Sequence, residues 1–150
     1  MSLLILIILA TLFYTLFEVF ASRAGNRIDA NLSATIFNGL GAIIPIVAYM
    51  FYKFIKGTKL IASTTSGIIY SVLAGVSIAL FSVLLIKIFE KGGGLAYVIP
   101  LIYGGSIILA SLTGWLVFKE SISGLHALGI IVIIAGIALV IISKLQVSAV

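Results

Sequence analysis

The sequence predicts an all-α fold: a polytopic membrane protein with five transmembrane helices in a compact bundle. The first observation is composition, because 63% of the residues are hydrophobic and only 9% are charged, with a mean hydropathy of +1.38. Soluble domains average roughly 45–50% apolar residues. The second is that five apolar stretches fill almost the whole chain. A helix needs roughly 20 residues to cross a hydrocarbon core of about 30 Å, and each of these stretches is about that long.

These stretches place helices at about residues 3–22, 32–55, 66–89, 95–118 and 123–143. Helices are favoured over barrel strands because the apolar runs are long and continuous. Strands of a membrane barrel are about 10 residues long and alternate in polarity. The connecting loops are short, so we expect residues 1–150 to form a single domain.

Several classes of function are disfavoured by what the chain lacks. It has no cysteine and only one histidine, His126, so we expect no disulfide, thiolate chemistry or metal site. The nine Lys and Arg residues are scattered singly at helix ends. We therefore expect membrane lipid, and no nucleic acid, as a partner. The Gly92–Gly94 run is not followed by the Lys and Ser or Thr of a phosphate-binding loop. We therefore expect no cofactor and no enzymatic activity.

Five crossings would leave the two chain ends on opposite sides of the membrane. A second copy inserted upside down could then pair with the first about an axis in the membrane plane, as inverted repeats do in many transporters. Orientation follows the Lys and Arg residues of short loops. The two sides carry four and five of them respectively: Lys53, Lys56, Lys59 and Lys119 against Arg23, Arg27, Lys87, Lys91 and Lys144. This near-even tally either indicates dual topology, as an antiparallel homodimer, or reflects how few charges there are.

The first predicted helix carries a polar stripe, with spacings of three and four that place it on one face: Thr11, Tyr14, Thr15, Glu18 and Ser22. Glu18 is the only carboxylate well inside a predicted span. Ionisable groups there usually face a bundle interior or a water-filled cavity. We interpret Glu18 and Tyr14 as candidate cavity residues, with Glu18 taking up a proton or attracting a cationic substrate. Alternatively, Glu18 pairs with Arg23 or reaches the headgroups.

The second predicted helix contains Asn38 close to Pro45. A proline frees a backbone carbonyl, so this region could line a cavity, bend, or hold a harmless kink. Tyr70, near one end of the third helix, is either an aromatic of the membrane interface or a cavity wall. The third helix also has small residues that would allow a neighbouring helix to approach closely: Ser71, Ala74, Gly75, Ser77 and Ser82.

The fourth predicted helix carries one continuous stripe: Tyr97, Leu101, Gly104, Ile108, Ser111 and Trp115. With Pro100 and Tyr103, its aromatic rings and glycines could bound an apolar or cationic substrate. Ordinary helix packing with interfacial aromatics explains the same pattern. On the fifth helix, Gly129 and Gly136 are seven residues apart and fit a close helix–helix contact, plausibly between subunits.

The second half of the chain resembles the drug/metabolite transporter superfamily, and most closely a single EamA-type five-helix repeat. The residues that carry the resemblance are the runs Leu95–Pro100, Ser111–Trp115 and Phe118–Ile122, followed by Leu128–Ile130 and Ala135–Ile137. The same stretch is similar to the last two helices of small multidrug resistance proteins, including Trp115, Gly129 and Gly136. The resemblance covers the whole chain loosely, with specific motifs from about residue 92 to 138.

This resemblance implies a gradient-driven exporter of a small metabolite or lipophilic compound. It would work by alternating access in the cytoplasmic membrane, as an inverted homodimer. Small multidrug proteins keep an essential glutamate in their first helix, and Glu18-Val19 looks like it. Small multidrug proteins have four helices, however, and the last three predicted helices of this chain resemble the last three of theirs. Either the extra helix of this chain lies between its first helix and these three, or the likeness of Glu18 to the essential glutamate is a coincidence. The alternative function is a non-transporting membrane subunit that packs against a partner protein.

Overall fold

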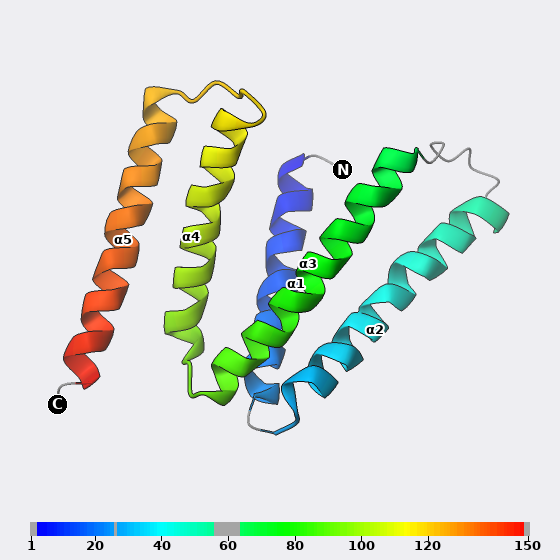
Figure 1. Ribbon diagram of the computed structural model, residues 1–150, viewed down its shortest axis with the longest axis horizontal. Coiled ribbons are helices and arrows are strands. Elements are labelled where there is room, and N and C mark those ends of the chain that lie inside the picture. Colours follow the sequence, from blue (N-terminus) through cyan, green and yellow to red (C-terminus); the bar gives the residue numbers. More distant parts are fainter. Residues whose placement is uncertain (1–2, 26, 56–63, 149–150) are drawn as a thin grey trace. The chain divides into compact units, whose positions relative to one another are not determined.

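The computed structural model describes residues 3–25, 27–55 and 64–148. Its helices, shown in Figure 1, are α1 (Leu3–Ala24), α2 (Ala30–Met50), α3 (Thr65–Glu90), α4 (Leu95–Leu116) and α5 (Gly124–Ser148), with a π-helical segment, η1 (Phe51–Ile55), directly after α2. No strand occurs within the described ranges. The all-α prediction is therefore confirmed.

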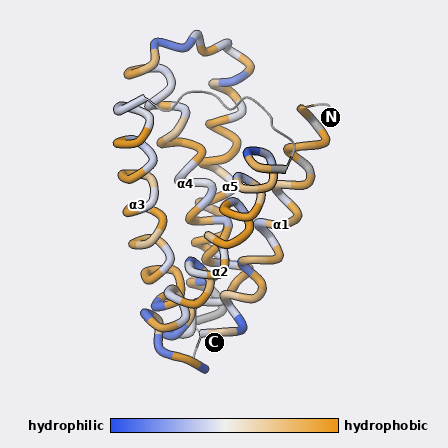
Figure 2. The backbone as a smooth tube through the Cα atoms, turned by 90° about the vertical axis from the view of Figure 1, so that its right-hand side faces the viewer, coloured by the Kyte–Doolittle hydropathy of each residue, from blue (hydrophilic) through white to orange (hydrophobic). Residues whose placement is uncertain are grey.

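Within these ranges, five helices are long and apolar enough to cross a membrane. The shortest span has 20 residues, which as an α-helix is about 30 Å. Figure 2 shows hydrophobic residues along the helices and the most hydrophilic ones near helix ends and loops. These features fit a multi-pass membrane protein.

The predicted helix positions agree with the observed ones, apart from a few end residues. α1 runs on to Ala24, and α4 stops at Leu116, two residues before the predicted end. Lys119 adopts a left-handed backbone, with φ of 55°. The Glu120 N–H donates to the Gly114 carbonyl at 3.0 Å. This turn closes the end of α4 earlier than hydrophobicity alone indicates.

Polar side chains at the helix starts explain where three of the helices begin. The Asp29 carboxylate accepts from the backbone N–H groups of Asn31 and Leu32 at 2.9 and 3.1 Å, which caps α2. The Thr64 hydroxyl accepts from Gly67 N–H ahead of α3, and Ser123 accepts from His126 N–H at the start of α5. These bonds satisfy amide groups that the first helical turn leaves without partners.

The far end of α2 is marked by a change of helix type. Pro45 lies inside α2, where it removes one amide donor from the helical ladder. After Met50 the backbone widens into η1. The Lys53 ammonium lies 5.5 Å from the ring centroid of Tyr49 and 5.4 Å from that of Phe54. These cation–π contacts hold Lys53 at the helix end, while Lys56 and Lys59 lie outside the described residues.

The helices form two compact units, α1–α3 and the α4–α5 hairpin. In the hairpin, Gly104 of α4 packs against Ile137 of α5, and a side chain at Gly104 would lie only 2.7 Å from Ile137 Cγ1. The Ser111 hydroxyl and His126 Nε2 are 3.3 Å apart, which joins the same two helices nearer their connecting turn. Two members of the predicted α4 stripe thus face α5. A single domain and a compact bundle of all five helices stay predictions.

The first unit buries its side chains at one end only, the end where α1 turns into α2. Leu85 and Ile86 of α3 are fully buried there. Nearby, small residues let the helices approach: Ala21, Ala30, Ser33, Ala34 and Ser82 are all buried. In contrast, the described residues 39–47 and 64–80, at the other end of α2 and α3, are exposed. Of the small residues singled out in the third helix, only Ser82 lies in the buried region.

Gly25, directly after α1, packs tightly against α3. A Cβ atom at this position would lie 2.7 Å from Phe89 Cβ and 3.2 Å from the Phe89 carbonyl carbon. Neither atom is the end of a flexible side chain, so the backbone itself would have to move. Glycine at position 25 therefore sets how closely the two helix ends pack.

We predict that Gly25→Ala lowers the free energy of unfolding by about 1–3 kcal/mol, because overpacking displaces backbone. The matched control is Gly105→Ala in α4, where nothing lies within 4 Å of the added methyl group. That change should be neutral, or stabilising by up to about 1 kcal/mol, through helix propensity. Chemical unfolding in detergent, followed by circular dichroism, measures both. Equal effects of the two substitutions would contradict the close contact.

Candidate functional site

A contact between two polar side chains joins α2 to α3 inside their apolar spans. The Ser82 hydroxyl donates its proton to the Ile78 carbonyl at 2.6 Å, and its oxygen lies 3.5 Å from the Asn38 side-chain oxygen. The Asn38 amide donates to the Ala34 carbonyl at 2.8 Å. Ser82 is buried and Asn38 is half-buried. Asn38, predicted as a cavity residue, thus lies at a helix–helix contact with part of its amide still accessible.

Glu18 of α1 lies at about the same depth as this pair. α1 and α3 run in the same direction (Figure 1), and Gly25 meets Phe89 near their ends. Glu18 lies seven residues before Gly25, and Ser82 lies seven residues before Phe89. Because every α-helix rises by the same distance per residue, we infer a similar depth for the two side chains. The rings of Phe17 and Phe37, each next to one of these polar residues in sequence, are 5.1 Å apart. We call Glu18, Asn38 and Ser82 the polar layer.

Glu18 is the most unusual member of the polar layer. Its side chain is only 5% exposed. Among the described residues it makes no hydrogen bond or ion pair, so it does not pair with Arg23, which is exposed. The interpretation of Glu18 as half of an ion pair with Arg23 is therefore wrong. A buried carboxyl group without a partner is costly, which makes Glu18 the strongest candidate for a functional group.

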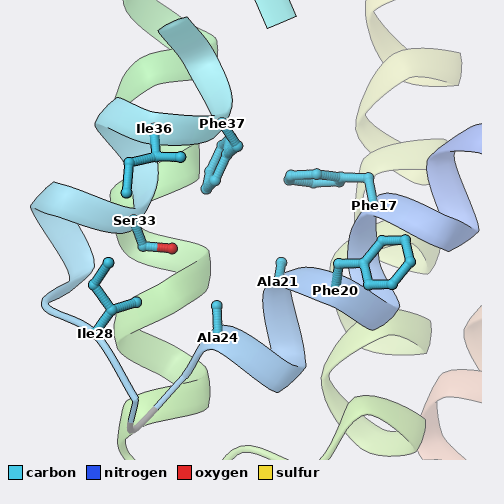
Figure 3. Close-up of a pocket in the computed structure, with 8 residues that line it drawn as sticks. All are labelled: Phe17, Phe20, Ala21, Ala24, Ile28, Ser33, Ile36 and Phe37. Carbon is cyan, nitrogen blue, oxygen red and sulfur yellow. The ribbon is translucent and has the colours of Figure 1, made fainter. Parts of the chain in front are cut away.

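An apolar pocket lies beside the polar layer, between α1 and α2 (Figure 3). Its volume is about 290 Å³. The rings of Phe17 and Phe37 face one another at one side of it, and the Ser33 hydroxyl points into it. The pocket continues toward the turn between the two helices. Its lining has no charged side chain: Phe17, Phe20, Ala21, Ala24, Ile28, Ser33, Ile36 and Phe37.

Ser33 is the only polar residue of this lining and is itself 6% exposed. Most hydroxyl groups in these helices donate to the backbone carbonyl one turn earlier, as Thr11 and Thr35 do at 2.9 and 2.8 Å. The Ser33 hydroxyl has no hydrogen-bond partner among the described residues. It is therefore a buried polar group that a ligand in the pocket could satisfy.

A second, more polar groove lies on the opposite side of α2, against α3. It has a volume of about 430 Å³ and is lined by Asn31, Thr35 and Asn38, with Ala79 and Val83 across from them. Asn31, Thr35 and Asn38 follow one another at spacings of four and three, so they share a helix face. Sequence analysis identified Asn38 but not its two companions.

The other predicted site residues of α1 and α3 lie away from this pocket. Tyr14 is 39% exposed, one turn before Glu18, and its ring centroid is 5.9 Å from that of Phe17. Tyr70 is 71% exposed and lies twelve residues before Ser82 on α3, a separation of about 18 Å along a helix. The structure thus links Glu18 and Asn38 through the ring contact of their neighbours Phe17 and Phe37, places Tyr14 against Phe17, and leaves Tyr70 apart.

The remaining predicted residues belong to the α4–α5 hairpin. Tyr97 and Tyr103 are half-buried, Pro100 is exposed, and Trp115 is exposed near the end of α4. Gly104 is covered by Ile137, as described above. Gly129 and Gly136 have nothing within 4 Å of the position of a side chain, so α4 does not pack on them. They leave a bare surface on α5.

The chain has no group of three or more His, Cys, Asp or Glu side chains within its described ranges that could hold a metal ion. The chemistry available at the polar layer is that of one carboxyl group, one amide and one hydroxyl group. Such a set can bind a proton or a cation and can donate or accept hydrogen bonds.

We predict that Glu18→Leu stabilises the protein by about 1–3 kcal/mol, because an apolar side chain of similar size removes the cost of burying a polar group without a partner. Thermal unfolding in detergent measures the change. The conservative control is Leu16→Ile on the exposed side of α1, which should leave stability unchanged. A lower melting temperature for Glu18→Leu would show that Glu18 is held by interactions that stabilise the fold.

Comparison with models of protein families, with curated proteins and with solved structures gives no match to this chain. The candidate site is therefore defined by the burial, contacts and chemistry of its own residues.

Proposed function

We propose that this chain is one half of a secondary active transporter, which exports a small metabolite or lipophilic compound by alternating access. Its five helices would cross the cytoplasmic membrane as a compact bundle, and two copies of opposite orientation would form the working homodimer. The observation that carries this proposal is Glu18, a carboxyl group only 5% exposed and without a partner among the described residues. It lies within a helix long and apolar enough to span a membrane.

A single buried carboxyl group supports coupled transport for a simple reason. It is stable when it binds a proton, or when it is ionised and a cation lies against it, but it is costly when ionised alone. Proton and cation therefore compete for the same place. Asn38 and Ser82, at the same depth, add neutral hydrogen-bonding groups that could contact the rest of a substrate.

The second copy is proposed from three independent features. The near-even charge tally removes a strong preference for one orientation. Within the α1–α3 unit the described residues 39–47 and 64–80 are exposed, and within the α4–α5 hairpin nothing lies against Gly129 and Gly136. The resemblance to the EamA-type repeat, a unit that occurs twice in ten-helix members, also favours two copies. Glycines spaced by seven on a membrane helix suit close packing against such a partner.

The test of coupling uses tetraphenylphosphonium, a lipophilic cation, as the probe. We predict saturable binding to the reconstituted protein that tightens as the pH rises, because fewer protons then compete for Glu18. Glu18→Gln keeps the shape of the side chain but cannot ionise, so it should lose both the binding and its pH dependence. Equilibrium dialysis against proteoliposomes at a series of pH values provides the measurement.

Glu90→Gln is the matched control, because it removes a carboxyl group at the end of α3, outside the polar layer. It should bind the probe as the unmodified protein does. Unchanged pH dependence in Glu18→Gln would assign Glu18 a structural role and would favour a membrane subunit that does not transport.

A further inference from the structure

We propose that the pocket between α1 and α2 binds a neutral aromatic compound of about two rings that carries one hydroxyl group. This deepens the proposed function by naming a substrate class. It depends on the proposed membrane insertion but not on Glu18, which does not line the pocket.

The size and shape of the pocket set the first limit on its ligand. An apolar cavity of about 150 Å³ holds one benzene ring, so the 290 Å³ here has room for about two rings. The rings of Phe17 and Phe37 meet edge-on, at an interplanar angle of 70°, and both border the pocket (Figure 3). Aromatic ligands bind more tightly next to such rings, because offset or edge-on ring contacts add binding free energy to that of burying apolar surface.

The charge of the lining sets the second limit. All eight lining residues are uncharged, and seven of them are apolar. A charged ligand would give up its hydration without gaining a partner of opposite charge, which is strongly unfavourable. The pocket therefore selects neutral compounds, in contrast to the cation proposed at Glu18.

The Ser33 hydroxyl sets the third limit. It is 6% exposed, lacks a partner among the described residues and points into the pocket. A lipid acyl chain or a detergent tail would fill the space but leave this hydroxyl unsatisfied. A ligand with one hydroxyl group would satisfy it, and such a hydrogen bond changes affinity by about threefold to tenfold.

The position of the pocket agrees with this class of ligand. The pocket extends from Phe17 and Phe37, beside the polar layer, to Ile28 in the turn that follows α1. It therefore reaches the helix ends, where lipid headgroups are expected. Aromatic compounds with a single polar group concentrate in that zone, as Tyr and Trp side chains do.

The experiment compares three probes of similar size: 2-naphthol, 2-methylnaphthalene and the cation N-methylquinolinium. Binding to the full chain in nanodiscs is measured by equilibrium dialysis, with empty nanodiscs subtracted to remove partition into lipid. We expect saturable binding of 2-naphthol, about threefold to tenfold tighter than that of 2-methylnaphthalene. N-methylquinolinium should not displace 2-naphthol.

Two variants connect this preference to the pocket. Ser33→Ala should abolish the preference for 2-naphthol over 2-methylnaphthalene while both still bind. Ala24→Leu should fill the pocket and remove saturable binding of both, whereas Ala10→Leu, at an exposed position of the same helix, should change nothing. A preference that survives in Ser33→Ala, binding no greater than to empty nanodiscs, or displacement by the cation would each overturn the proposal.

Glu18→Gln separates this proposal from the transporter hypothesis. The variant should bind 2-naphthol as the unmodified protein does. If tetraphenylphosphonium binding proves independent of Glu18 while Ser33 still governs 2-naphthol binding, the coupling role fails and the aromatic site stands. Loss of 2-naphthol binding in Glu18→Gln would contradict a pocket independent of the carboxyl group.

Discussion

The close approach of three helix ends is the constraint on which the rest of the first unit depends. Gly25 lets α1 meet α3 at the backbone of Phe89, and buried alanines and serines let α2 join them. A membrane offers little hydrophobic force between helices, so close packing of small residues has to supply the contact. Because this packing is confined to one end, the other ends of α2 and α3 are exposed within this unit.

That constraint also decides which polar groups are buried. Once Gly25 and Phe89 set the register, Glu18 and Ser82 each lie seven residues before this contact, and Ser82 in turn contacts Asn38. The same approach creates the pocket between α1 and α2, because Ala21 and Ala24 are too small to fill the space below Phe17 and Phe37. The buried carboxyl group and the buried Ser33 hydroxyl both cost free energy in the isolated chain. A ligand or a proton would recover part of that cost.

The sequence predicted the helices well because each span is a long apolar run, and it identified Glu18 because one carboxyl group in such a run is rare. Asn38 was found for the same reason. Ser33, Phe17 and Phe37 were missed as a group, since a serine and two phenylalanines in apolar helices carry no signal until two helices meet at a given register. The small residues of α3 show the converse: five share a plausible pattern, yet the fold buries only Ser82 among them. Which small residue makes contact depends on where the helices converge.

The α4–α5 hairpin shows what part of the residue stripe on α4 reflects. Gly104 and Ser111 contact α5, so at these two positions the pattern reflects packing within the hairpin. Gly129 and Gly136 do not take part in that packing within the hairpin. Glycine lowers helix propensity, and the proposed homodimer would give these two positions a role in close helix packing.

Single-cysteine labelling tests the central claim, a homodimer of oppositely inserted copies, most directly, because the chain has no cysteine of its own. Lys91→Cys and Ser121→Cys place one thiol at each end of α4. Each variant is treated in intact cells with a membrane-impermeant maleimide and compared with permeabilised cells. The account predicts that about half of the copies are labelled from outside at both positions. Full labelling at one position and none at the other would contradict it.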